Sequence, residues 1–537
     1  MKSTHHLRCV ALCLLGTAVP AYAQFDPAKV LREPPAVAAR FPDPAVSYPT
    51  PSLRPDRTDF ASHAEVLAFL DETAKAAGGR VQIETIGHSQ KGLPVPLAVL
   101  TASGRPDPAL PTVMVIAQQH GNEPASGEAA LALVQQLAGP KAALLSRVNV
   151  LVVPRGNADG AERFARATAN GIDVNRDHLL LRTPEARAIA AATLKYAPQV
   201  VLDLHEFTVA GRWVDKFGAM QKYDALVQPA TVGNLNPQIA ATAQRDHVDR
   251  ITAAWTRAGL NSFAYHTTSP DPRDPVVSMG GVQADTGRNT SGLRPAISLL
   301  IEVRGVGLGR AHLLRRVHTA VIAGMTAVET AAEQGGALVQ LVRTASADIG
   351  AQACRGELVV SARHSMTRQR MVFVDAVTGV DKAIEVDWRA AEPLDVQRRR
   401  TRPCGYLIAA EQTEALERLR LLGVRMQPVD QATRWSVEGY RVLEESGGRR
   451  QDARGAIDDG EGGGIRVLDV ALEPEQKVAA PGAWYVDLDQ PMGALIAAAL
   501  EPDSQNSFAA NRLLDPARLW RVLQVPPAGA VAPLARP

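Results

Sequence analysis

The chain has few cysteines, few aromatic residues and almost no net charge. Its 537 residues include 4 Cys, 4% aromatic residues and a formal net charge of +2. The balanced charge gives no reason to expect nucleic acid or an acidic surface as a partner. No apolar run after the N-terminus reaches the roughly 18 residues of a membrane helix, so we expect no membrane span. Hydrophobic residues make up 46% of the chain, which predicts a soluble globular protein with two or more domains.

The first residues have the pattern of a secretory signal peptide. In "MKSTHHLRCVALCLLGTAVPAYAQ", Lys2 and Arg8 precede a short apolar run that ends in Ala-Tyr-Ala, the small-x-small pattern that signal peptidase cleaves. We expect cleavage after Ala23 and a periplasmic or secreted protein. Because no cysteine follows the cut directly and Cys13 lacks the small residue usual before a lipidated cysteine, a lipoprotein is not expected.

Two cysteines remain after that cleavage. Cys9 and Cys13 leave with the signal peptide, and Cys354 and Cys404 form an even pair in an oxidising compartment. We predict a disulfide between them, with two separate buried thiols as the alternative.

The mature chain divides into regions of different character. Residues 24–57 are rich in proline and have no period, so we expect an extended N-terminal arm. Residues 58–335 alternate apolar strands with helices, which is typical of an α/β fold whose mixed central sheet carries helices on both faces. We expect a smaller α+β C-terminal domain of unknown role at 336–525, and a flexible tail at 526–537. The oligomeric state stays open.

Two of the clearest strands lead directly to histidines. His120 follows "PTVMVIAQQ", and His205 lies at the end of "QVVLDLHEF". Glu123 is three residues after His120 and precedes the helical segment "SGEAALALVQQLAG", for which Ser126 is a candidate N-cap. A His-x-x-Glu match alone is expected by chance, but α/β sheets bind ligands at the carboxyl ends of their strands. Since catalytic zinc takes three protein ligands, we predict one Zn²⁺ per chain on His120, Glu123 and His205.

A zinc hydrolase also needs a base that takes a proton from water and returns it to the leaving amine. Glu302 in "AISLLIEVRG" is a carboxylate in an apolar strand, where burial is unfavourable without a role or a partner. We predict that Glu302 is the general base. The alternative is a structural salt bridge to Arg304 or Arg310.

The segment "RATANGIDVNRDH" supplies further polar groups. Asn175 and Arg176 together offer a neutral donor and a guanidinium fork, which suit a carboxylate. Asp173 is a candidate partner for the second N–H of a metal-binding histidine, and Arg166 is free to stabilise an oxyanion. A polar surface turn is the alternative interpretation.

Together these segments resemble the M14 family of zinc metallocarboxypeptidases, the carboxypeptidase A class. "HGNEP", "PRGNADG", "GIDVNRD", "DLHE" and "LLIEVRG" occur here in the family's order, and the resemblance covers about residues 60–330. It implies zinc on His120, Glu123 and His205, with Asp173 orienting His120 and Glu302 as the general base. It further implies that Arg166 stabilises the oxyanion and that Asn175 and Arg176 hold the substrate's terminal carboxylate. The region after 335 resembles an extension of some exported bacterial members.

The resemblance leaves two features of the substrate site open. Tyr223 and Tyr265 are the only tyrosines between the third ligand and the base, and neither matches the mobile tyrosine that many members place over the substrate. The loop "DTGRNTSGLRP" is where the resemblance places a specificity pocket. Asp285 would attract a basic side chain there and Arg288 an acidic one, or the two pair with each other.

The expected function is that of an exported zinc-dependent carboxypeptidase, which hydrolyses a C-terminal peptide bond with a zinc-activated water and a glutamate general base. Its partner would be a peptide or a cell-wall peptide with a free C-terminal carboxylate. The alternatives are a related zinc amidohydrolase or deacylase acting on N-acyl amino acids, and a catalytically silent binding protein. The presence of every catalytic candidate argues against the silent protein.

Overall fold

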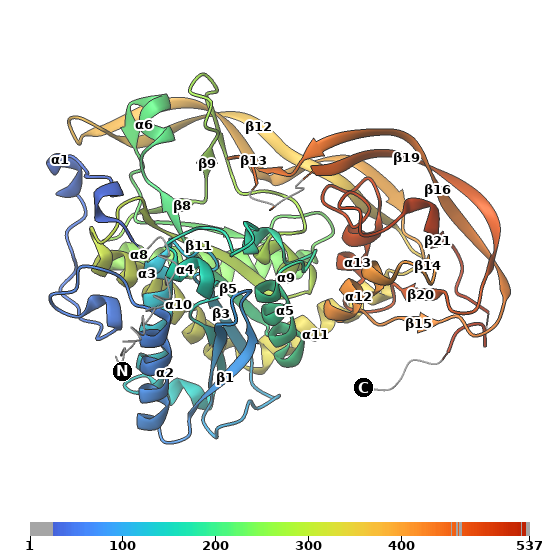
Figure 1. The fold of residues 1–537 in the computed structure, drawn as a ribbon, viewed down its shortest axis with the longest axis horizontal. Helices are drawn as coiled ribbons and strands as arrows, with labels where there is room; N and C mark the ends of the chain where they lie inside the picture. The colour runs from blue at the N-terminus through green and yellow to red at the C-terminus, as the bar shows by residue number, and fades with distance from the viewer. Residues whose placement is uncertain (1–24, 453, 458–459, 461–463, 528, 533–537) are drawn as a thin grey trace, which may run out of the picture.

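The computed structural model describes residues 25–452, 454–457, 460, 464–527 and 529–532 (Figure 1). The predicted signal peptide and its cleavage site after Ala23 lie outside the described residues, as do the last residues of the predicted tail. The N-terminal arm is irregular apart from short helical turns such as α1 (Pro35–Ala38). Glu33 of this arm contacts Arg304 and His312, so the arm packs against the part of the chain that contains the central sheet.

An eight-stranded mixed sheet lies at the centre of the N-terminal two thirds of the chain (Figure 1). In spatial order the strands are β1 (Val81–His88), β2 (Pro94–Leu100), β4 (Asn149–Val153), β3 (Thr112–Ala117), β5 (Val200–Thr208), β11 (Ile297–Val306), β7 (Ala225–Pro229) and β8 (Ser262–Ala264). Strands β3, β4, β5 and β11 run parallel to one another. β2 pairs antiparallel with both β1 and β4, whereas β7 is antiparallel to β11 and parallel to β8.

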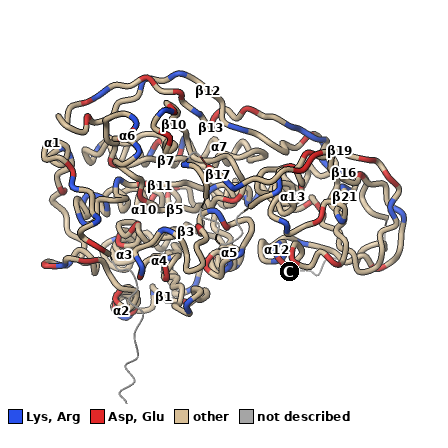
Figure 2. Tube along the Cα trace, turned by 45° about the horizontal axis from the view of Figure 1, so that its top comes forward, with Lys and Arg blue, Asp and Glu red and all other residues tan. Residues whose placement is uncertain are grey.

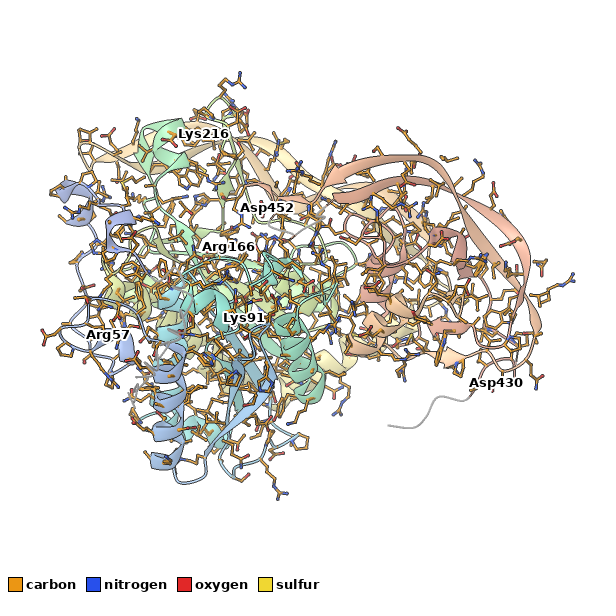
Figure 3. The ribbon with its side chains drawn as sticks, viewed as in Figure 1. Arg57, Lys91, Arg166, Lys216, Asp430 and Asp452 are labelled. Carbon is orange, nitrogen blue, oxygen red and sulfur yellow. A yellow bond between two sulfur atoms is a disulfide. The ribbon has the colours of Figure 1, made fainter. Side chains whose placement is uncertain are left out.

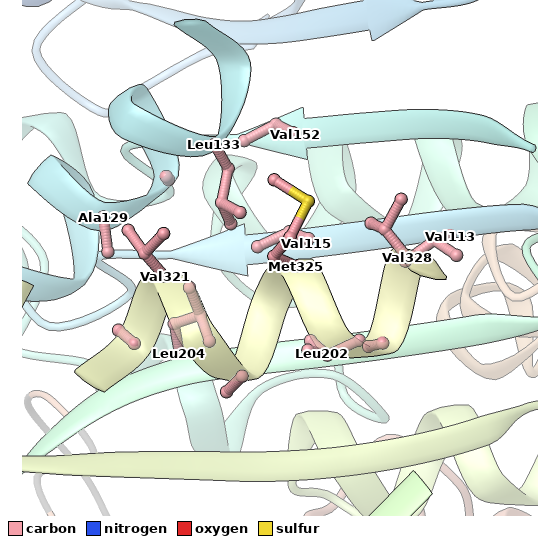
Figure 4. Close-up of a cluster of buried hydrophobic side chains, with 14 of the residues drawn as sticks. Val113, Val115, Ala129, Leu133, Val152, Leu202, Leu204, Val321, Met325 and Val328 are labelled. Atoms are coloured by element: carbon pink, nitrogen blue, oxygen red, sulfur yellow. The ribbon is translucent and has the colours of Figure 1, made fainter. Parts of the chain in front are cut away.

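Helices cover both faces of this sheet. Val113 and Val115 of β3 face a core that includes Leu133 and Met325 from two helices (Figure 4), whereas Met114 belongs to the core of the opposite face. This alternation follows from the two-residue period of a strand. One face carries α2 (His63–Ala76), α3 (Pro124–Ala138), α8 (Asp249–Arg257) and α10 (Leu313–Gln334), and the other α5 (Pro184–Tyr196) and α9 (Gly287–Leu293). The predicted α/β fold with a mixed central sheet is confirmed.

Helix α3 begins two residues before the predicted N-cap. Pro124 occupies the first turn and Glu123 is the capping position, because proline is favoured where the backbone N–H has no helical partner. Ser126 lies inside the helix, and its hydroxyl donates a hydrogen bond to the Glu123 carbonyl (2.7 Å). The prediction of Ser126 as the N-cap is therefore wrong. Shorter helices are α4 (Ala158–Glu162), α6 (Arg212–Phe217) and α7 (Pro237–Thr242).

The C-terminal region contains a six-stranded sheet and shares a second sheet with the earlier part of the chain. The six strands are β15 (Gln427–Pro428), β20 (Trp484–Asp487), β14 (Gly405–Ile408), β21 (Leu519–Val522), β16 (Thr433–Arg449) and β19 (Gly464–Ala479). The shared sheet contains β6 (Ala219–Met220), β12 (Glu357–Asp375), β13 (Asp381–Thr401), β10 (Val276–Ser278) and β9 (Thr267–Thr268). The long hairpin β12–β13 thus crosses over the N-terminal two thirds (Figure 1).

Three helices and a disulfide complete the C-terminal region. The helices are α11 (Gly336–Ala351), α12 (Thr413–Leu421) and α13 (Gly493–Leu500). Cys354 and Cys404 are joined in the predicted disulfide, which links the segment after α11 to the start of β14. Gly335 separates α10 from α11 and has a φ of 52°, a conformation that glycine adopts readily.

Charges of both signs are interspersed along the described part of the chain (Figure 2). Among the described residues, no helix combines the length and the apolar character of a membrane span.

Candidate active site

The three predicted metal ligands meet at the carboxyl ends of two neighbouring strands. β3 and β5 pair in parallel, so their carboxyl ends lie at the same edge of the sheet. His120 follows β3, Glu123 directly precedes α3, and His205 belongs to β5. The turn between the first two needs glycine, because a Cβ on Gly121 would lie 1.9 Å from the carbonyl carbon of Gly160.

The donor atoms of these residues converge. Nδ1 of His120 lies 2.8 Å from Glu123 Oε1, Nδ1 of His205 lies 2.9 Å from Glu123 Oε2, and the two Nδ1 atoms are 3.0 Å apart. All three side chains are buried and form one possible metal-binding group. Two imidazole nitrogens and a carboxylate are the ligand types of a catalytic zinc site, which keeps a further position for water.

Each histidine has a carboxylate on its other ring nitrogen. His120 Nε2 lies 3.0 Å from Asp173, the partner that the sequence suggested, and His205 Nε2 lies 2.7 Å from Asp203. Such contacts fix the ring orientation of metal-binding histidines. The carboxylates next to His120 and His205 are therefore also what a zinc site requires. Sequence reasoning missed Asp203, although residues two apart on a strand share a face and "DLHE" carries that signal.

Glu302 lies on the strand next to His205. β11 pairs with β5 so that Glu302 is opposite His205, and the Glu302 side chain lines the same pocket as His120. Burial raises the pKa of the Glu302 carboxyl to about 7, although His205 favours its charged form. Arg304 pairs instead with Glu33, and the Arg310 guanidinium donates to backbone carbonyls. The salt-bridge alternative for Glu302 is therefore wrong.

Arg166 is anchored rather than free. Its Nε and Nη2 donate to one oxygen of Asp173 (3.1 and 2.8 Å), and its Nη1 lies 3.3 Å from Glu123. Burial alone would raise the pKa of the Asp173 carboxyl, but Arg166 and His120 hold it well below its usual range. Asp173 thus connects the guanidinium to the metal-binding group.

Asn175 and Arg176, which were predicted to bind one carboxylate together, contact different groups in this structure. The side-chain oxygen Oδ1 of Asn175 accepts a hydrogen bond from the Gly287 N–H (2.8 Å), and the side-chain nitrogen Nδ2 lies 3.0 Å from His205 Nε2. Arg176 instead pairs with Asp452 (2.7 Å), a residue of the C-terminal region. The predicted carboxylate-binding arginine therefore already contacts a carboxylate of its own chain.

Asp452 and its neighbour Arg454 line the pocket together with Tyr265. Asp452 lies in β17 (Gln451–Asp452), which pairs with β18 (Gly455–Ala456), and it binds Arg454 as well as Arg176. In Figure 3 Asp452 and Arg166 both lie toward the middle of the molecule. Burial raises the pKa of Tyr265 to about 12, so its hydroxyl keeps its proton. The sequence left open whether Tyr223 or Tyr265 lies near the substrate, and in the structure Tyr265 lines this pocket.

Comparisons with known proteins indicate the class of protein to which this chain is similar. Residues 66–208 match the family model described as zinc carboxypeptidase. Carboxypeptidase 2 of Trichophyton rubrum is 25% identical over 497 residues, which cover 89% of this chain and 90% of that protein. Carboxypeptidase SOL1 of Arabidopsis thaliana is 30% identical over 163 residues, covering 27% of this chain and 33% of that protein.

Two solved structures that match part of this chain are named as carboxypeptidases. A metallo-carboxypeptidase from Burkholderia cenocepacia has a TM-score of 0.38 and 20% identity, covering 50% of this chain and 70% of that one. The carboxypeptidase A from Helicoverpa armigera has a TM-score of 0.40 and 16% identity, covering 56% and 78%.

Residues 66–208 thus contain an M14 zinc carboxypeptidase domain, and the chain is an enzyme of the metallocarboxypeptidase class, as the resemblance predicted. Because the alignment with the Trichophyton protein covers 89% of this chain, it includes most of the C-terminal region as well. That region is therefore aligned with a fungal relative, whereas the sequence resemblance had suggested bacterial members.

Proposed function

We propose that the chain is an exported zinc carboxypeptidase that removes the last residue from peptides with a free C-terminal carboxylate. The observation that carries this proposal is that one pocket is lined by His120 of the metal-binding group, by Glu302 and by Arg176. The match of residues 66–208 to the zinc carboxypeptidase family model supports it.

His120, Glu123 and His205 would hold the zinc ion. Zinc, when bound, lowers the pKa of a coordinated water and polarises the carbonyl of the bond to be broken. Glu302 takes the proton from water and returns it to the nitrogen of the leaving amino acid. Burial raises the pKa of the Glu302 carboxyl above its ordinary value, toward the working pH at which a general base is most effective.

Arg166 and Arg176 have different roles in the proposed reaction. Arg166, held by Asp173, offers a fixed positive charge next to the metal-binding group for the developing oxyanion. Arg176, which pairs with Asp452 in this structure, binds the substrate's terminal carboxylate. Asn175 contacts Gly287 and His205, so it positions the pocket wall and a metal ligand.

Export is supported by the N-terminal sequence and by the disulfide between Cys354 and Cys404, since disulfides persist in oxidising compartments. We expect the mature protein in the periplasm or the medium, beginning at Gln24. N-terminal sequencing of the secreted protein tests this, and a protein that retains residues 1–23 contradicts it.

A substrate panel with product identification tests the activity. We expect release of a free amino acid from peptides with a C-terminal carboxylate and little release from the same peptides with an amidated end. Equal cleavage of both forms would show that no terminal carboxylate is recognised. Hydrolysis of N-acyl amino acids with no hydrolysis of peptides would assign the chain to the deacylases instead.

A further inference from the structure

Arg288 differs from the other arginines of the pocket in its electrostatic partners. The arginines that line the pocket are Arg166, Arg176, Arg288 and Arg454. Asp173 pairs with Arg166, and Asp452 pairs with Arg176 and Arg454. Within the part of the chain that the structure describes, Arg288 makes no ion pair with a carboxylate. Of these four arginines, Arg288 is therefore the one whose guanidinium has no carboxylate of the described residues in direct contact.

The hydrogen bonds of Arg288 go to neutral oxygen atoms. Its Nη2 donates to the Gly281 carbonyl (2.6 Å) and to the Thr231 hydroxyl (3.3 Å). The residue is 4% exposed, and its buried Nε has no hydrogen-bond partner among the described residues. No bond from Nη1 is found in that part of the chain either. The guanidinium is thus held through Nη2, and its Nη1 and Nε donors have no hydrogen-bond partner among the described residues.

The pocket wall is shaped around this guanidinium. A Cβ on Gly280 would lie 3.0 Å from both Nη1 and Nη2 of Arg288, closer than ordinary van der Waals contact. Gly280 itself is held by a hydrogen bond from its N–H to the Gln228 side chain (2.8 Å). A glycine at this position therefore leaves room for the charged group beside the backbone.

Asp285 does not neutralise Arg288. The Asp285 carboxylate is buried and binds Arg450 and the Asn506 amide (2.7 Å), both from the C-terminal region. The two residues that the sequence left open as a possible pair are therefore separate, and Asp285 has no carboxylate oxygen in the pocket lining. This arrangement argues against a pocket for a basic side chain.

A buried positive charge without an anion is unfavourable unless a ligand supplies the anion. Arg288 has the planar fork of donors that suits a carboxylate. We propose that Arg288 is a specificity-determining residue that binds the side-chain carboxylate of a C-terminal glutamate or aspartate in the substrate. The inference rests on the proposed carboxypeptidase function, in which Arg176 binds the other carboxylate, at the chain end.

The test compares N-acylated tripeptides that differ only in the last residue, which is Glu, Asp, Gln, Leu or Lys. Glu and Gln have the same shape and differ in charge, so their kcat/KM ratio isolates the electrostatic contribution. We expect the wild-type protein to favour Glu over Gln by at least about tenfold, because hydrogen bonds to charged groups are among the strong ones. Lys should be the poorest substrate.

Three variants separate this role from a structural one. Arg288→Met should lower kcat/KM for the Glu peptide to the level of the Gln peptide and leave the Gln and Leu peptides nearly unchanged. Arg288→Lys should keep part of the preference for Glu, since it keeps the charge but loses the fork. Arg294→Met is the matched control, because Arg294 follows the same helix and lines a different cavity; it should keep the wild-type ratio.

The outcomes distinguish the inference from the function on which it rests. Release of C-terminal residues with equal rates for Glu and Gln would overturn the role of Arg288 and leave the carboxypeptidase proposal standing. An unchanged Glu-to-Gln ratio in Arg288→Met would also overturn it. No release from any peptide would overturn the proposed function, and the inference with it. Zinc content and thermal unfolding of each variant identify any protein that has not folded. If Arg288→Met does not fold, the ratio of kcat/KM for the Glu and Gln peptides in the wild-type protein and in Arg288→Lys decides the role of Arg288.

Discussion

The contact between Asp452 and Arg176 predicts that the protein restrains its own substrate binding. In the proposed function the C-terminal carboxylate of the substrate binds Arg176, which already holds the carboxylate of Asp452 (2.7 Å). Substrate must therefore displace Asp452 or share the guanidinium with it. The substitution Asp452→Asn removes the competing charge and keeps the size of the side chain, so we expect a lower KM for free-acid peptides.

The magnitude follows from the geometry of this ion pair. The Asp452 and Arg176 side chains are only 9% and 12% exposed, so solvent screens them little. Hydrogen bonds between charged groups contribute about 1.5 to 3 kcal/mol, and 1.4 kcal/mol corresponds to a factor of ten in affinity. The side-chain oxygen of the asparagine in Asp452→Asn would still accept a weaker hydrogen bond from Arg176. We therefore expect an effect at the lower end of this energy range, which is a decrease in KM of about tenfold. Turnover should change little, since Asp452 takes no part in proton transfer.

Initial rates on one peptide, as the free acid and as the amide, measure this effect. The free acid should show the lower KM in Asp452→Asn, and the amide should not respond. Glu445→Gln is a suitable control, because Glu445 forms a surface ion pair with Arg466 on the neighbouring strand. A KM that stays the same would refute competition between Asp452 and substrate. A higher KM would show instead that Asp452 positions Arg176 for binding.

Three further changes test other parts of the structure. His205→Ala removes one of the three donor groups, so metal analysis should find well below one zinc per chain; full zinc content would disprove the ligand assignment. Glu302→Gln should keep zinc but lower kcat by about 10² to 10⁴, and near wild-type turnover would contradict a base at this position. Burial, with help from the Arg155 charge, lowers the pKa of His63 from 6.5 to about 4 although Asp159 opposes this. The unfolded chain therefore binds that proton first, and stability should fall by about 3 kcal/mol as the pH drops from 6.5 to 4. Denaturant unfolding of His63→Gln should show a correspondingly flatter pH dependence, and an identical slope would contradict this.

The sequence predicts the metal-binding group well because the fold brings strand ends together. His120, Glu123 and His205 each lie at or just beyond the end of an apolar strand, and parallel neighbours in a sheet end at one edge. The same reasoning applies to Glu302, whose strand pairs in parallel with that of His205. A local pattern therefore carries information on a contact between residues far apart in the chain.

The pocket residues that do not lie at the ends of central-sheet strands could not be predicted from the sequence by this reasoning. Asp452 is 276 residues from Arg176, and it follows a long strand with no motif that points to a partner. Tyr265 lies between the short strands β8 and β9, and Arg288 lies in the short helix α9; neither segment is long enough for a periodic pattern to show which way a side chain points. The partner of Asp285 was open for the same reason, since Arg450 and Asn506 both come from the C-terminal region.

The C-terminal region contributes to the substrate pocket from two sides, although its sequence suggested no chemistry. Asp452 and Arg454 enter the pocket directly. On the other side, β13 pairs with β10, the strand that leads into the pocket residues Met279 and Gly280. His364 of β12 also lies 3.1 Å from the Gly280 carbonyl. A chain that ended at α10 would lose the ion pairs of Arg176 and the strand that supports the wall beside Arg288. The charged side chains of the pocket therefore come from both parts of the chain, whereas the metal-binding group comes from β5 and the turn between β3 and α3 alone.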